Sequence, residues 1–275
     1  MLKKAKIVSS NRQTNMQFPV GHLDSTHAYD TLSENALQNL PPRSYDSWVN
    51  CEATSFRFER EMVKPLVALL PTVFHLHTGQ RARLLREQAI GSVIPDLLFG
   101  IWSGELPRYH GLNTVSRYIL AWLSTQKMAN SEEQLREVLL LSQHAADSAV
   151  ATLKRVGAIS RRDSGEVDLS PEFDVSGSVR IIAIEMKLKR WREALAQAVE
   201  YRKFADEAYV VLDGNQVRMN IEVREAFVAN GIGLFLQRSG AIEREIPAEP
   251  IAPRPSEGRL FAVSKLASSG PYCLA

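Results

Sequence analysis

The chain has 275 residues, 45% of them hydrophobic, which is enough for a large buried core and excludes a disordered or collagen-like protein. No apolar run approaches the roughly 20 residues that cross a bilayer, and the basic first residues lead into polar ones rather than a secretion segment. Only two cysteines occur, Cys51 and Cys273, which argues against a disulfide framework and favours a cytoplasmic protein.

The net charge of +2 gives no overall positive field, but the basic residues are unevenly placed. Arginines outnumber lysines by 23 to 10, and arginine is the better phosphate ligand. Residues 180–203 hold seven basic and three acidic side chains. This segment is either a solvated helix face or, beside a phosphodiesterase site, a nucleic-acid-binding surface with Lys189, Arg190 and Arg192 as contacts.

The first half of the chain begins with a polar arm, residues 1–50, followed by the first part of a core, 51–128. A helix is predicted from Ser55 to residue 70, because Ser55 is a suitable cap and carboxylates occupy the first turns. Pro65 is expected to kink this helix and Pro71 to end it. Strands are predicted over 72–77, 82–88 and 96–102, and a further helix over 114–126.

Residues 129–170 have the pattern of a winged helix-turn-helix inserted into the core. A helix starting at Ser131, a break at 141–143, a second helix over 147–156 and a hairpin around 163–165 follow one another in the order of such domains. The candidate DNA contacts are Ser148, Thr152, Lys154, Arg155, Arg161 and Arg162. The alternative is a module that only binds proteins, since it holds five basic and seven acidic residues.

The second part of the core, 171–246, alternates between strands and helices. Strands are predicted over 180–187, 208–212 and 231–236, with helices over 190–205 and 220–229. The tail, 247–275, holds four prolines in its first nine residues and is expected to be extended or disordered. Without the insertion, the order of elements predicts an α/β core with one sheet flanked by helices.

The strand over 180–187 ends in two charges, Glu185 and Lys187, although four apolar residues in a row predict a strand buried on both faces. Strand periodicity points these two side chains to the same side. Glu185-Met186-Lys187 is the only acid-x-Lys triplet, and with 10 lysines and 31 acids in 275 residues about one is expected by chance. Its position at a buried strand end is therefore the informative feature.

Ile94-Pro95-Asp96 together with Ile184-Glu185-Met186-Lys187 resembles the motifs of the PD-(D/E)XK, or restriction-endonuclease-like, nuclease superfamily. Gln197 and Tyr201 resemble the QxxxY signature of its RecB-like branch. The resemblance covers about 55–128 and 171–237 and implies a mixed sheet flanked by helices. Asp96 and Glu185 are 89 residues apart, an excess that the insertion explains, although the pairing of the two motifs is an inference.

The resemblance implies a Mg²⁺ or Mn²⁺ site formed by Asp96, Glu185 and the main-chain carbonyl of Met186. Lys187 would position the attacking water and offset transition-state charge. Gln197 and Tyr201 would orient the lysine or the DNA backbone. A carboxylate in the first helix is also common in the superfamily, and at 100° per residue Glu59, unlike Glu61, falls within the apolar arc of that helix.

Less specific interpretations apply to each motif alone. Asp96 could be a turn residue after Pro95, and Glu185 and Lys187 could form an ordinary ion pair at a strand end. The sequence taken as a whole predicts a Mg²⁺-dependent nuclease acting on DNA, alone, as a homodimer or only within a larger assembly. The alternative is a non-catalytic DNA-binding regulator that keeps the nuclease-like scaffold.

Overall fold

The computed structural model describes residues 55–106, 112–126, 131–170, 173, 179–238, 240–252 and 254–268. The predicted arm, 1–50, lies outside this range. Six strands form one sheet in the order β1-β2-β5-β6-β7-β8. Their bounds are β1 Gln80–Arg86, β2 Leu97–Ser103, β5 Val179–Lys187, β6 Glu207–Asp213, β7 Gly233–Arg238 and β8 Ala241–Ile246. Among the described residues, no helix combines the length and the hydropathy needed to cross a membrane.

The sheet is mixed, and β5 lies at its centre. β1, β2 and β5 pair antiparallel, whereas β5, β6 and β7 pair parallel, and β8 adds an antiparallel edge. Helix α6, Trp191–Tyr201, connects β5 to β6, and α7, Ile221–Asn230, connects β6 to β7. Parallel neighbours need such crossovers, so the predicted α/β core with one sheet flanked by helices is confirmed.

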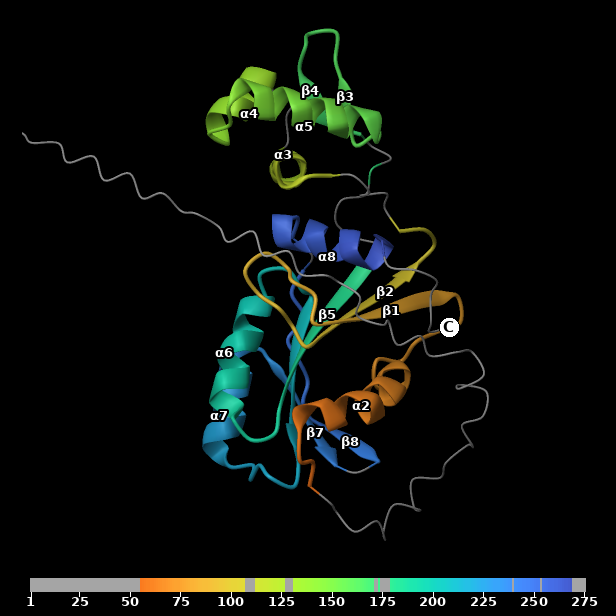
Figure 1. The fold of residues 1–275 in the computed structure, drawn as a ribbon, viewed down its shortest axis with the longest axis vertical. Helices are drawn as coiled ribbons and strands as arrows, with labels where there is room; N and C mark the ends of the chain where they lie inside the picture. Colours follow the sequence, from red (N-terminus) through yellow and green to blue (C-terminus); the bar gives the residue numbers. More distant parts are fainter. Residues whose placement is uncertain are drawn as a thin grey trace, which may run out of the picture. The chain divides into compact units, whose positions relative to one another are not determined.

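Helices cover both faces of the sheet (Figure 1). Helix α2, Glu59–Val73, packs on one face in a cluster that contains Ile182, Ile184 and Met186 of β5. On the other face, α6, α7 and α8, Glu257–Ser268, pack in a second cluster with Ile181 and Ala183. Successive residues of β5 therefore pack on opposite faces of the sheet, and the alternation places Glu185 and Lys187 on the face covered by α6.

The predicted start and end of the first helix are both wrong, as is the strand predicted over 72–77. The helix begins at Glu59, and Ser55 does not cap it, because the Ser55 hydroxyl donates to Asp213 instead. Helix α2 continues through Pro65 and Pro71 to Val73, and a turn with His75 at φ +50° leads to β1. A proline lacks one N–H and crowds one carbonyl, but the apolar stripe continues through the buried Leu70 to the buried Phe74. Burial of that stripe against the sheet outweighs the helix-breaking tendency of Pro71.

The expectation of an extended or disordered tail is wrong for 257–268, which form α8. Arg259 is 2% exposed and fixes this helix: its guanidinium donates to Asp206 Oδ1 at 2.7 Å and to the carbonyl of Val179 at 2.7 Å. Gly100 of β2 allows the close approach, because a Cβ there would lie 2.4 Å from Leu266 Cδ1. The four prolines precede the helix and do not interrupt it.

The inserted segment forms α4, Glu132–Val138, α5, Gln143–Arg155, and a hairpin of β3, Ile159–Arg161, with β4, Val167–Leu169. The order of elements is the predicted one, although α5 starts earlier because Ser142 caps it by accepting from the N–H of Ala145. Helix α3, Thr114–Thr125, contacts α5, β4 and α8. The assignment as a winged helix stays a prediction.

Candidate functional site

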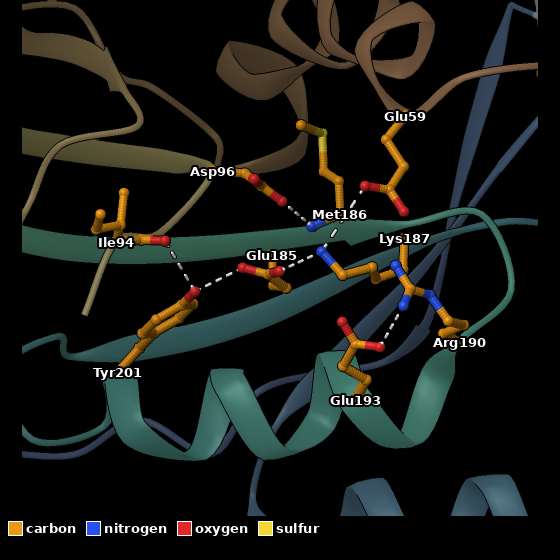
Figure 2. A network of polar contacts seen from close by, with 9 residues as sticks. All are labelled: Glu59, Ile94, Asp96, Glu185, Met186, Lys187, Arg190, Glu193 and Tyr201. Carbon is orange, nitrogen blue, oxygen red and sulfur yellow. Dashed lines mark hydrogen bonds and ion pairs between the residues drawn. The ribbon is translucent and has the colours of Figure 1, made fainter. Parts of the chain in front are cut away.

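The two sequence motifs meet where β2 begins and β5 ends. Asp96 precedes β2, and its Oδ2 accepts a hydrogen bond of 2.6 Å from the main-chain N–H of Met186 (Figure 2). The antiparallel register pairs Leu97 with Ile184, so the start of one strand lies beside the end of the other. The contact joins positions that are 90 residues apart in the chain.

Glu185 and Lys187 form a buried ion pair. Their residues are 1% and 8% exposed, and Lys187 Nζ donates to Glu185 Oε1 at 2.7 Å. The same ammonium lies 3.8 Å from Oε2 of Glu59, the first residue of α2. Burial of a charge is costly unless the charge is paired, so Glu185 and Lys187 depend on each other, while the partly exposed Glu59 is a second acidic neighbour of the lysine.

Tyr201 completes the surroundings of Glu185. It is the last residue of α6, 1% exposed, and its hydroxyl donates to Glu185 Oε2 at 2.5 Å while lying 3.3 Å from the carbonyl oxygen of Ile94. Burial, together with Glu185, raises the pKa of this phenol well above its ordinary value, so it remains a donor at all working pH values. Both oxygens of Glu185 are thus occupied, one by Lys187 and one by Tyr201.

Burial and an excess of negative charge together set the electrostatics of the site. Burial and then repulsion by Glu185 raise the pKa of Asp96 to about 6, although the N–H of Met186 and the charge of Lys187 act to lower it. Burial acts to lower the pKa of Lys187, but its hydrogen bond to Glu185 and the surrounding carboxylates raise it overall, and the ammonium stays charged. Three carboxylates therefore share one cation, an arrangement that a divalent metal ion would relieve.

The donor set fits a hard divalent ion better than a structural zinc ion. Within the described ranges, no group of three or more His, Cys, Asp or Glu side chains is arranged to hold a metal. Asp96 and Glu185 supply two carboxylates, and Asp96 Oδ1 has no hydrogen-bond partner among the described residues. Magnesium keeps several waters and often binds through only one or two carboxylates, so a two-carboxylate site with a main-chain carbonyl suits it.

Gln197 lies apart from the network that Tyr201 joins. It is exposed on α6, and no hydrogen bond links it to another described residue. The carbonyl of Ile94 takes part instead, a contact that side-chain motifs do not reveal. Glu61 also lies apart: its carboxylate accepts from the N–H groups of Arg57 and Phe58 and caps α2.

On the expectation from the sequence that this site cleaves nucleic acid, Tyr201→Phe should lower the cleavage rate about tenfold, because Glu185 loses the donor that fixes its orientation. The free energy of unfolding should fall by about 2 kcal/mol, the range for a hydrogen bond to a charged group. Steady-state cleavage kinetics and urea denaturation measure the two effects. Gln197→Ala, one turn away on the same helix, is the matched control and should change neither; an equal loss in both variants would contradict this role of Tyr201.

Most of the predicted DNA-binding cations already have acidic partners. On the insertion, Lys154 and Arg161 lie 3.1 and 3.9 Å from Glu132, and Arg162 lies 2.5 Å from Asp168. Near the site, Arg190 pairs with Glu193 at 2.8 Å, and Arg192 pairs with Glu222. Arg155 and Lys189 are exposed and form no ion pair within the part of the chain that is described. DNA contact by any of the seven stays a prediction.

Comparisons with protein families, with curated proteins and with solved structures found no match to this chain.

Proposed function

We propose that this protein is a metal-dependent nuclease with a restriction-endonuclease-like core. The observation that carries the proposal is the hydrogen bond from the N–H of Met186 to Asp96, which brings a second carboxylate beside the Glu185–Lys187 pair. The mixed sheet flanked by helices supports the fold that the sequence resemblance implies.

Each residue of the site has a proposed role that suits its chemistry and its position. Asp96 and Glu185 would hold Mg²⁺ or Mn²⁺, with the carbonyl of Met186 as a main-chain ligand. When bound, the ion would supply Lewis acidity toward the phosphate and a lower pKa for the attacking water. Lys187 stays charged, so it can orient that water and offset the negative charge that develops on the phosphate. Tyr201 keeps the carboxylate of Glu185 in one orientation.

We propose DNA as the substrate. The exposed Lys189 lies two residues after the end of β5. It belongs to the basic segment 180–203, which also contains Glu185 and Lys187, and this excess of positive charge suits a polyanion. The inserted helices and hairpin would dock the substrate or a partner protein. Arg155 is the cation of this module that is exposed without an acidic partner among the described residues.

Cleavage assays test the proposal. The purified protein is incubated with single-stranded, duplex and branched DNA and with RNA, in Mg²⁺, in Mn²⁺ and in a chelator. We expect metal-dependent cleavage of at least one DNA form. Absence of cleavage of every substrate in both metals would refute a nuclease that acts alone, and cleavage restored only by a partner would indicate a subunit of a larger assembly.

A second candidate function, a non-catalytic DNA-binding regulator, is favoured by two observations. Both oxygens of Glu185 are already engaged by Lys187 and Tyr201, and the described residues hold no cluster of three ligand side chains. Calorimetric titration with Mn²⁺ discriminates the two functions. A nuclease should show heat that disappears in Glu185→Ala, whereas a regulator should show no heat in either protein while it binds DNA.

A further inference from the structure

Asp213 is a buried carboxylate outside the proposed reaction set. It ends β6 and is 0% exposed. Its Oδ2 accepts from Ser55 Oγ at 2.8 Å, from the N–H of Phe56 at 2.9 Å and from Gln216 Nε2 at 2.9 Å, while Oδ1 accepts from the N–H of Asn215 at 2.8 Å. Every donor is uncharged, and no described basic side chain pairs with this carboxylate. A buried carboxylate held only by neutral donors is costly, which indicates a specific task for these bonds.

The bonds of Asp213 fix the start of α2. Gln216 Nε2 also donates to the carbonyl of Phe56 at 2.8 Å, so the main-chain N–H and C=O of Phe56 are both held by residues at or just after the end of β6. The next two N–H groups, of Arg57 and Phe58, donate to Glu61. The backbone is thus held at three consecutive residues, and α2 begins at Glu59 directly after them.

Asp213 also lies beside β5, the strand that carries Glu185 and Lys187. In the parallel pairing of β5 with β6, Lys187 is opposite Leu212, so Asp213 lies one residue beyond the partner of Lys187. Glu59 lies only three positions after Phe56, a span of at most about 10 Å. The Glu59 carboxylate lies 3.8 Å from Lys187 Nζ.

We infer that Asp213 is a positioning residue that holds Glu59 against Lys187 by anchoring the start of α2 to the end of β6. The inference rests on the proposed nuclease function and adds a residue to it. Sequence patterns did not single out Asp213, although it carries the same signal as Glu185, a charge at the end of an apolar strand.

Asp213→Asn tests the inference with little change in size. The amide replaces one carboxylate oxygen with a donor, which Ser55, Phe56 and Gln216 cannot all satisfy. We expect kcat for nucleic-acid cleavage to fall by up to about 100-fold, the loss that a displacement of about 1 Å at a reaction site can cause, with little change in KM. In a Glu59→Gln background, the same substitution should cause no further loss of kcat. Ser55→Ala removes one donor and should show a smaller loss with the same dependence on Glu59.

Gln237→Met is the matched control. Gln237 is also buried, comes from the neighbouring strand β7 and donates to the carbonyl of Met62 in α2 at 2.9 Å. Its loss should lower the melting temperature while leaving kcat unchanged. Hydrogen exchange locates the effects without an activity assay: Asp213→Asn should speed exchange of amides 56–62, whereas Gln237→Met should not affect amides 56–58.

Two results would overturn the inference while leaving the nuclease proposal intact. One is an unchanged kcat in Asp213→Asn despite faster exchange at 56–62, and the other is a loss of kcat that is equally large with and without Glu59. If the wild-type protein cleaves no nucleic acid, the nuclease proposal fails and the positioning role fails with it, even where exchange shows that Asp213 anchors α2.

Discussion

Glu185→Gln is expected to lower the proposed metal-dependent DNA cleavage about 100- to 1,000-fold, the loss seen when one group that stabilises transition-state charge is removed. The glutamine has the size of the glutamate and can still hydrogen-bond Lys187 and Tyr201, but it no longer supplies an anionic ligand. Single-turnover cleavage in Mg²⁺ measures the effect. Lys187 keeps Glu59 as an acidic neighbour, which helps the variant remain folded.

The control for this prediction is Glu243→Gln. Glu243 lies on β8 and forms an exposed ion pair with Arg238 of β7, so the substitution removes a carboxylate of the same kind away from the site. Exposed pairs contribute about 0 to 1 kcal/mol, so neither folding nor cleavage should change. A thermal melt shows whether Glu185→Gln is folded at the assay temperature. A folded Glu185→Gln that cleaves at the wild-type rate would exclude Glu185 from the reaction.

Asp96→Asn is expected to abolish cleavage and yet to stabilise the metal-free protein at neutral pH. Folding raises the pKa of Asp96 from 3.8 to about 6, so the folded protein binds a proton more tightly than the unfolded chain. The destabilisation by the charged form is therefore absent below pH 4, grows as pH rises through 6, and is complete above it. At 1.36 kcal/mol per pKa unit, and allowing for partial exposure, the gain at pH 7 should be about 2 kcal/mol.

Urea denaturation in a chelator at pH 4, 5, 6 and 7 measures this effect as the difference between variant and wild type. The difference should grow with pH, because asparagine keeps an acceptor for the N–H of Met186 but carries no charge. Asp163→Asn, at an exposed position, should show no such difference. Added Mn²⁺ should stabilise the wild type and not Asp96→Asn. If Asp96→Asn, relative to wild type, is less stable at pH 7 than at pH 4, the charged carboxylate of Asp96 does not destabilise the folded protein and the prediction is wrong.

Local sequence patterns determined the elements around the site. The apolar run ending in Glu185 and Lys187 predicts a buried strand over 180–187, and β5 covers Val179–Lys187. Helical periodicity selects Glu59 over Glu61, and the structure has Glu59 beside Lys187 while Glu61 caps α2. These inferences depend on the side-chain directions of one helix or strand, which backbone geometry sets locally.

The tertiary structure alone decided which segments meet. The sequence could not show that Asp96 reaches Met186, because that contact depends on the strand register between residues 90 positions apart. It could not separate Tyr201 from Gln197, since packing of α6 buries one and exposes the other. Nor could it predict α8 after four prolines, because a buried ion pair between Arg259 and Asp206 holds that helix on the sheet. Local patterns fix the direction of a side chain along its own strand or helix, whereas its partners depend on long-range packing.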